Sequence, residues 1–153
     1  EGFHVPFIHK GLNEDISCNN YKTKIIDHGV LQYAVNKSTS KSNQVLKDNM
    51  YAYYYWIFPN MMFNFYNWGL SINIIEPMDK QKTRVRFLSF PIKGFSQPDN
   101  DSSDLDTIEK EDQKVVLSVQ KGISSFNYNK GRYSAKHEKG LHYFHQLLSR
   151  YLD

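Results

Sequence analysis

Two histidines near the start of the chain have a spacing that could serve a metal ion. His4 and His9 stand five positions apart with Pro6 between them, and Glu1 precedes His4 by three positions. On a straight helix, residues five apart are separated by about 140° of rotation, so their side chains could not share one small ligand. Proline disfavours helical geometry in the residue before it and lacks a backbone donor. We therefore expect a helix end that breaks between the histidines and lets both imidazoles face one point.

A carboxylate much later in the chain is the third candidate ligand. Apolar residues at three- and four-residue steps predict a helix there, and its apolar face includes Asp112 beside Ile108, Val115 and Val119. A carboxylate buried without a partner is costly, and a bound metal is one of the few groups that offset this cost. The adjacent Glu111 is expected to point away from that face into solvent.

Each candidate also has an ordinary structural interpretation. The two histidines could be unrelated, with one buried and hydrogen-bonded and the other exposed. Asp112 could form a buried ion pair, for example with Arg132, or it could lie on a helix that is rotated enough to expose it. The pattern of residue types leaves these alternatives open.

Two imidazoles and one carboxylate form a recognised set of metal ligands. They occupy one face of an octahedron and leave three positions open, which suits Fe(II) in the activation of dioxygen. Zinc in a hydrolase is the chemical competitor. The chain lacks the His-Glu-x-x-His sequence of metalloproteases, however, and no glutamate stands between His4 and His9 to act as a base.

Strand patterns fill the chain between the histidines and Asp112. Residues 21–35 are rich in β-branched and aromatic side chains and predict one or two strands. The densest aromatic segment, 51–68, predicts two strands around the Phe58-Pro59-Asn60 sequence. Residues 71–76 and 83–90 alternate as the two strands of an antiparallel hairpin do.

Helical periods follow the strands. The first helix is expected over residues 103–122, and the second is expected from Ser134, which can cap it, to about Tyr151. The polar segments expected to form loops are 10–20, 36–49 and 94–106. This order predicts an α+β domain in which an antiparallel sheet wraps around the long C-terminal helix and leaves a cavity between them.

The composition limits the class of protein. The chain has 153 residues, 40% of them hydrophobic, which fits one globular domain. A net charge of +3 without a basic stripe argues against nucleic-acid binding, and the single cysteine, Cys18, excludes an internal disulfide or a cluster held by several thiolates. Without a signal peptide or a membrane-spanning apolar run, a cytoplasmic protein is expected. The chain begins without Met inside a predicted helix, so we expect a piece of a longer polypeptide.

Several segments, in order along nearly the whole chain, resemble one enzyme family. The sequence Glu-Gly-Phe-His-Val-Pro-Phe-Ile-His at residues 1–9 resembles the iron-binding motif of the Rieske-type ring-hydroxylating oxygenases, in the catalytic domain of their α subunit. The branch with phenylpropionate- and choline-type oxygenases is the most similar. The other matching segments are the Trp-Ile-Phe-Pro-Asn strand at 56–60, Glu111-Asp112-Gln113 followed by 119–122, Gly-Arg-Tyr-Ser at 131–134 with Glu138, and 142–145.

The resemblance implies that residues 1–153 form a helix-grip catalytic domain with mononuclear Fe(II) held by His4, His9 and Asp112. It also implies that Glu1 matches the acidic residue that links the iron to a [2Fe–2S] Rieske cluster, usually across the subunit interface of a homotrimer. A reductase or ferredoxin would supply electrons, and O2 would hydroxylate or oxidatively demethylate a small organic substrate. The resemblance further implies that the Rieske domain lies outside residues 1–153, because one cysteine cannot supply the family's Cys-x-His and Cys-x-x-His pairs, and that the family's helix before the motif lies outside them too.

Two other classes of function are compatible with the same fold and residues. One is a non-catalytic helix-grip module that binds an apolar ligand, and the other is a zinc hydrolase. The substrate-binding residues are not specified by the sequence, although the aromatic strands could line a pocket for a ring or a quaternary ammonium group. His142 and His145 belong to the last predicted helix, where we expect His145 to be packed and hydrogen-bonded, and Arg132 and Glu138 are expected to pair.

Overall fold

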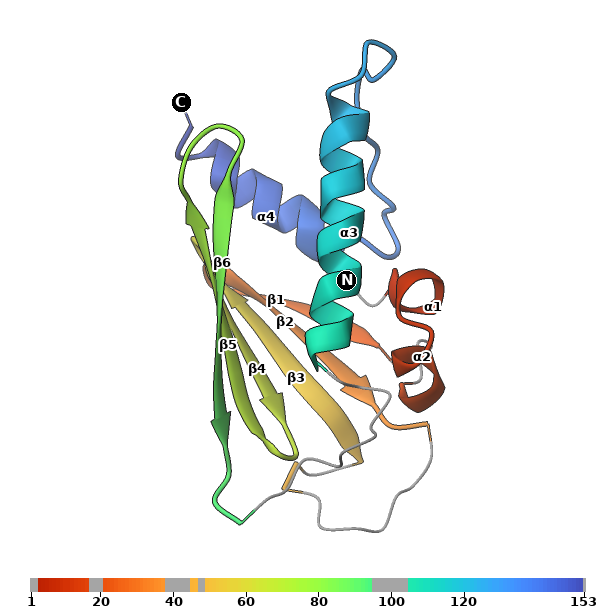
Figure 1. Ribbon diagram of the computed structural model, residues 1–153, viewed down its shortest axis with the longest axis vertical. Coiled ribbons are helices and arrows are strands. Elements are labelled where there is room, and N and C mark those ends of the chain that lie inside the picture. Colours follow the sequence, from red (N-terminus) through yellow and green to blue (C-terminus); the bar gives the residue numbers. More distant parts are fainter. Residues whose placement is uncertain (1–2, 17–20, 38–44, 47–48, 95–104, 153) are drawn as a thin grey trace.

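A computed structural model of the chain describes residues 3–16, 21–37, 45–46, 49–94 and 105–152. A single six-stranded sheet forms the centre of the fold, and four helices lie at one side of it (Figure 1). In chain order the elements are α1 (Val5–Ile8), α2 (Leu12–Asp15), β1 (Lys22–Ile26), β2 (Gly29–Val35), β3 (Met50–Ile57), β4 (Met61–Tyr66), β5 (Gly69–Pro77), β6 (Thr83–Pro91), α3 (Leu105–Ile123) and α4 (Lys139–Ser149).

The sheet is an antiparallel meander in which every strand pairs with the next one in the sequence. Short turns make this possible, such as the Asp27-His28 turn between β1 and β2, because antiparallel neighbours need only a few linking residues. The strands predicted from the aromatic and β-branched segments are therefore confirmed. The expected α+β class, with an antiparallel sheet, is also confirmed.

One face of the sheet carries the residues that meet the helices. Because side chains alternate along a strand, cross-strand partners project from the same face. A row of such partners runs Gln32, Tyr54, Asn64, Ser71 and Ser89 across β2 to β6. The next row includes Trp56 and Asn73, which contact the helices as described below, and so both rows belong to the helix-covered face.

Helix α4 packs on this face at β1 and β2. Its Phe144 ring meets the Trp56 ring edge-on at a centroid distance of 5.0 Å, and its Leu147 side chain is only 1% exposed. Helix α3 stands in front of the sheet and crosses the strands (Figure 1). Of the helices in the described part of the chain, none is long and apolar enough to cross a membrane.

A small buried cluster joins the N-terminal helices to the sheet. It consists of Val5, Leu12, Ile16 and Ala34, with Ile108 of α3 among the partly buried residues packed against it. Burial of these side chains removes apolar surface from water and is the main favourable term that holds α1 and α3 near each other. The cluster therefore positions the two segments that carry the candidate ligands.

Two helical predictions need correction. Residues 10–20 were expected to be a loop, but Leu12–Asp15 forms α2 because Leu12 and Ile16 are buried in the cluster. The last helix begins at Lys139 rather than at Ser134, and α3, with 19 residues, is the longest helix. The Ser134 backbone N–H donates to Oε2 of Glu138 at 2.6 Å, so Ser134 begins a turn instead of capping α4. The expected loops at 36–49 and 94–106 lie largely outside the described residues.

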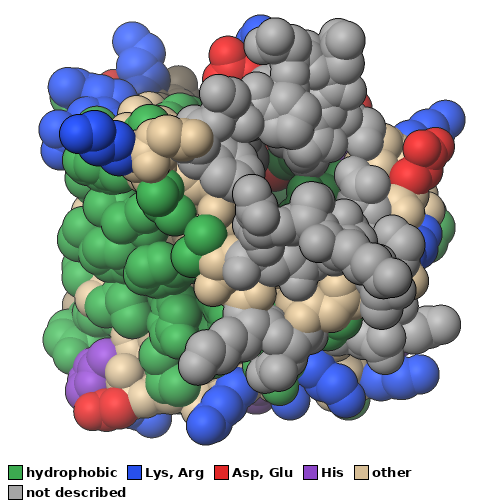
Figure 2. Space-filling view, turned by 90° about the horizontal axis from the view of Figure 1, so that it is seen from below, with side chains coloured by type: hydrophobic (Ala, Val, Ile, Leu, Met, Phe, Trp, Pro, Cys, Tyr) green, Lys and Arg blue, Asp and Glu red, His purple; other side chains and the backbone are tan. Residues whose placement is uncertain are grey.

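Apolar side chains are also exposed on the outer side of the sheet and along the edge strand β6, every residue of which is exposed. In Figure 2 apolar side chains gather on the left of the molecule, where β5 and β6 lie in Figure 1. Exposed apolar patches of this kind are typical of interaction surfaces. The exposed members on β4 and β6 include Phe65, Val85, Phe87, Leu88 and Phe90.

Candidate metal centre

The two N-terminal histidines flank a single turn of helix. His4 precedes α1 and accepts backbone hydrogen bonds from Phe7 and Ile8, while the N–H of His9 donates to Val5 at 3.0 Å. Pro6 lies in the first turn, where its missing N–H costs no helical hydrogen bond. The predicted break between the histidines is therefore wrong: the helix is so short that both histidines lie at its ends, outside the regular turn.

The imidazoles of His4 and His9 meet the carboxylate of Asp112. The Nε2 atoms of the two histidines are 3.1 Å apart. Oδ1 of Asp112 lies 3.1 Å from Nε2 of His9 and 3.6 Å from Nε2 of His4. These three residues are the group of potential metal ligands found among the described residues, and the chain brings them together from α1 and α3.

The donor set and its spacing fit a metal ion. For metal–ligand bonds of about 2.1 Å, ligand atoms at right angles to each other are about 3.0 Å apart, and ligands at a tetrahedral angle are about 3.4 Å apart. The two distances of 3.1 Å are close to the first value, and the third, 3.6 Å, is wider. Two neutral nitrogens and one carboxylate oxygen form the facial set that non-haem Fe(II) uses.

Asp112 reaches this position without being buried. Its side chain is 44% exposed, and several apolar residues of α3, including Val116 and Leu117, are exposed as well. The prediction that Asp112 lies on a buried apolar face is therefore wrong. Among the described residues the basic side chains within 4 Å of its carboxylate are those of His4 and His9 rather than that of Arg132. A metal ion is therefore indicated by the converging ligand atoms and not by burial of the carboxylate.

Glu111 contacts the same imidazole from its other side. Oε2 of Glu111 lies 2.8 Å from Nδ1 of His9, so the prediction that Glu111 points into solvent is wrong. Successive residues on a helix are separated by about 100°. Glu111 and Asp112 can nevertheless both reach His9, because they contact different nitrogens of its imidazole. Nδ1 faces Glu111 and Nε2 faces Asp112.

Glu109 is a further acidic residue near the site, and it was not among the candidates predicted from the sequence. It is three positions before Asp112 and hence on the same side of α3. Its Oε1 accepts a hydrogen bond of 3.3 Å from Asn73 Nδ2 on β5. Burial, with a smaller contribution from the negative charge of Asp112, raises the pKa of Glu109 to about 7. The i, i+3 spacing from Asp112 is the signal that could have found it.

The sheet face near Glu109 is polar and aromatic. The hydroxyl of Ser71 donates to Oδ1 of Asn73 at 3.3 Å, and both side chains are buried. The rings of Tyr54 and Tyr66 meet edge-on at 5.9 Å, and burial raises the pKa of both hydroxyls well above the ordinary value. Asn64, in the same cross-strand row as Tyr54 and Ser71, has a buried Oδ1 without a hydrogen-bond partner among the described atoms.

The other candidates are not part of the group of ligand atoms found among the described residues. Glu1 is outside the described residues. His145 is exposed, but its ring packs against the rings of Tyr133 and Phe144, and its predicted hydrogen bond exists, since Nδ1 contacts the Tyr133 hydroxyl. The Glu138 carboxylate bonds to the Ser134 N–H, and no ion pair with Arg132 is found in the described part of the chain.

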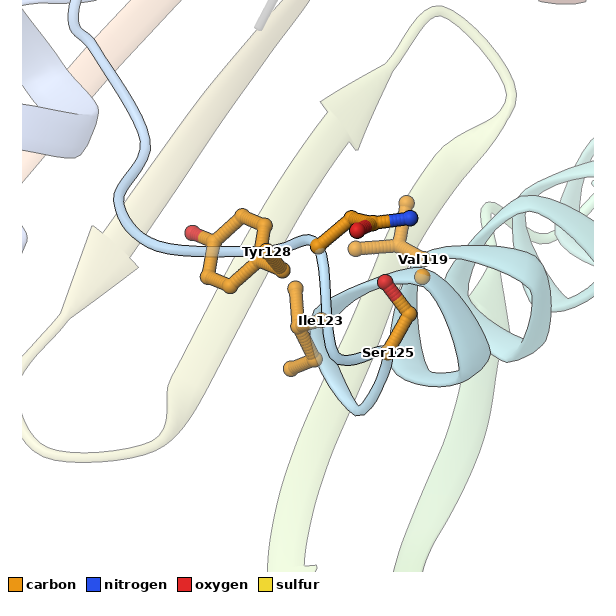
Figure 3. A pocket seen from close by; sticks show the side chains of 6 residues that line it. Val119, Ile123, Ser125 and Tyr128 are labelled. Carbon is orange, nitrogen blue, oxygen red and sulfur yellow. The ribbon is translucent and has the colours of Figure 1, made fainter.

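A surface hollow of about 360 Å³ lies at the C-terminal end of α3, away from Asp112 (Figure 3). It is lined by Val119, Ile123, Ser125 and Tyr128, among others, with Val119 and Ile123 projecting from the helix. None of the residues that line it belongs to the group around His9.

The sequence matches a protein family described as "Ring hydroxylating alpha subunit (catalytic domain)" over residues 1–153. The chain belongs to this family. Two similar curated proteins are chloroplastic choline monooxygenases. The one from Arabidopsis thaliana is 31% identical, with 96% of this chain and 36% of that protein covered, and the one from Beta vulgaris is 29% identical, with 99% and 34% covered.

A solved structure of the same architecture is that of the quaternary ammonium Rieske monooxygenase CntA in complex with an inhibitor. It superposes with a TM-score of 0.79 over 99% of this chain and 44% of that one, at 23% identity. At this identity the likeness supports the ring-hydroxylating catalytic-domain fold alone. The chain spans about a third of the length of the curated relatives that it matches.

Proposed function

We propose that this chain is the catalytic domain of a Rieske-type oxygenase that oxidises a small organic substrate with O2. Mononuclear Fe(II) would be held by His4, His9 and Asp112. The observation that carries the proposal is the approach of Asp112 Oδ1 and both histidine Nε2 atoms to within 3.1 to 3.6 Å of one another. Membership of the ring-hydroxylating family supports the same conclusion.

The three ligands would determine the charge and the open coordination positions of the bound metal. Two neutral imidazoles and one carboxylate reduce the charge of a divalent ion to +1 and leave half of an octahedron open for other ligands. Bound Fe(II) would supply the reductive activation of dioxygen. The His9 side chain is 2% exposed, whereas those of His4 and Asp112 are 40% and 44% exposed, so the site is open to solvent on the side of His4 and Asp112.

Electron supply and assembly belong to the proposal as well. Glu1 would link the iron to a [2Fe–2S] Rieske cluster in a domain outside this chain, and a reductase or ferredoxin would reduce that cluster.

We propose a helix-grip arrangement, in which the sheet wraps around the C-terminal helix, and a homotrimer. The exposed apolar side chains of β6 support an assembly. The cytoplasm is the proposed location, although the curated relatives are chloroplastic by name.

For the substrate we propose a quaternary ammonium compound. Aromatic faces attract such cations, and a nearby carboxyl group adds a negative charge when it is ionised. Tyr54 and Tyr66 lie on the helix-covered face, and Glu109 acts electrostatically on Tyr66. The names of the relatives support this class, because they are choline monooxygenases and a quaternary ammonium monooxygenase.

The metal in the purified full-length protein tests the first proposal. We expect about one non-Rieske iron per chain and O2 consumption that depends on substrate. Zinc at the site together with hydrolytic activity would support a zinc hydrolase. Metal content near zero would support a module that only binds an apolar ligand.

The substrate class is tested by comparing choline with 3,3-dimethylbutan-1-ol, which has the same shape but no charge. We expect choline to bind at least about tenfold more tightly, as a cation–π contact with an added ionic term implies. Tyr66→Leu should reduce this discrimination, whereas Tyr53→Leu, on the opposite face of β3, should not. Equal affinity for the two compounds would contradict the proposal.

A further inference from the structure

We propose that Glu111 is a positioning residue that fixes the tautomer and orientation of His9, and thereby keeps Nε2 of His9 available to a metal ion. The inference rests on the proposed metal site. It assigns a function to a carboxylate that contacts only one of the candidate ligands. The contact is the 2.8 Å hydrogen bond between Nδ1 of His9 and Oε2 of Glu111.

The direction of this hydrogen bond follows from its chemistry. An ionised carboxylate only accepts hydrogen bonds, so the proton must lie on Nδ1 of His9. In a neutral imidazole the other nitrogen then has a free lone pair. That lone pair is on Nε2, the atom that faces His4 and Asp112 at 3.1 Å. Glu111 therefore favours the tautomer that can bind a metal.

Without Glu111, a competing arrangement would be favourable. The opposite tautomer would carry its proton on Nε2 and donate it to Oδ1 of Asp112, which lies 3.1 Å away. This hydrogen bond would occupy both the lone pair of His9 and one oxygen of Asp112. His9 and Asp112 would then be hydrogen-bonded to each other and less available to a metal ion. Glu111 prevents this by holding the proton on the far side of the ring.

The position of His9 makes such control necessary. Its backbone is fixed by hydrogen bonds to Val5 and from Asn13, of 3.0 and 2.9 Å. These bonds hold the backbone and do not by themselves set the side-chain torsions of the imidazole. The ring is 2% exposed, so water cannot replace a missing partner at Nδ1 without rearrangement. Carboxylates that orient metal-bound histidines in this way typically contribute about 10- to 100-fold in metal affinity.

The first test is made without metal. The protein is labelled with ¹⁵N-histidine, treated with chelator and held at about pH 8.5, which is about two units above the pKa of histidine in model peptides. The His9 resonances are identified by their loss in His9→Gln. We expect the Nδ1–H tautomer in the wild type, a shift to Nε2–H in Glu111→Ala, and the wild-type tautomer in Glu111→Gln, which retains an acceptor oxygen.

The second test measures anaerobic binding of Fe(II) alone. We expect Glu111→Ala to weaken binding about 10- to 100-fold, Glu111→Gln to weaken it less, and the exposed neighbour Gln113→Ala to leave it unchanged. A tautomer that is the same in the wild type and in Glu111→Ala would overturn the assignment, whatever the affinities are. A tautomer shift in a protein that binds no Fe(II) would support the role of Glu111 while contradicting the proposed iron site.

Discussion

Oδ1 of Asp112 lies 3.1 Å from Nε2 of His9, although the two residues belong to helices at opposite ends of the sheet-forming segment. The contact joins α3 to the end of α1. Both helices also contribute to the buried cluster around Val5 and Ile108. The ligand geometry is therefore coupled to apolar packing, and a change in either should affect the other.

The first prediction concerns the packing of α4. Leu147 is 1% exposed, and truncation of a buried leucine costs about 2–5 kcal/mol. We expect Leu147→Ala to lower the free energy of unfolding by this amount in urea denaturation. The adjacent Gln146→Ala is the control, since Gln146 is exposed and should change stability by less than about 0.5 kcal/mol. Equal effects of the two variants would show that α4 does not pack as described.

The second prediction is a pH dependence caused by Glu109. The pKa of the Glu109 carboxyl is about 7 in the folded chain and 4.5 in the unfolded chain. Between these two pH values the folded chain therefore keeps a proton that the unfolded chain has released. Stability should therefore fall as the pH rises from about 4.5 to 7. After allowance for the partial exposure of the carboxyl, the loss is on the order of 1 kcal/mol.

Urea denaturation of metal-free protein at pH 5 and pH 8 measures this loss. Glu109→Gln cannot ionise, and so we expect a smaller fall in stability between the two pH values. Glu14→Gln, at an exposed carboxyl of α2, is the matched control and should retain the wild-type dependence. If the Glu109→Gln profile matches that of the wild type, the carboxyl does not titrate as described.

The third prediction compares two buried asparagines of the same sheet face. The amide oxygen of Asn64 has no partner among the residues that the structure describes, whereas Asn73 bonds both Ser71 and Glu109. Replacing an unpaired polar group by an apolar one of similar size is nearly neutral or stabilising, but removing a partner of other buried groups costs about 1–3 kcal/mol. We expect Asn64→Leu to preserve or raise the melting temperature and Asn73→Leu to lower it. A lower melting temperature for Asn64→Leu would indicate a partner for its amide.

The strands and the residue types of the candidate site could be predicted from the sequence. Alternation and aromatic content predict β1 to β6, because antiparallel pairing of neighbours depends on local patterns. The contact of Glu111 with His9 could not be predicted, because it depends on the rotation of α3 relative to α1. The start of α4 was misplaced because Ser134 has the chemistry of a cap, and only the structure shows its N–H bonded to Glu138 within a turn.

The polar character of the helix-covered face was also not predicted. Asn64, Ser71 and Asn73 alternate with apolar residues, and the same alternation is expected of a face exposed to water. Only the cross-strand register shows that these side chains form neighbouring rows beneath α3. The roles of His4, His9 and Asp112 as ligands, and that of Glu1 as a link to a Rieske cluster, stay predictions.

Anaerobic titration with Fe(II) tests the central claim most directly. We predict one tight site per chain in the wild type and at least about tenfold weaker binding in Asp112→Ala, which removes the only charged ligand of the set. The control is Asp106→Ala, at an exposed carboxyl in the first turn of the same helix, and it should bind as the wild type does. Fe(II) binding of equal affinity in the wild type and in Asp112→Ala, or its absence from the wild type, would contradict the proposed site.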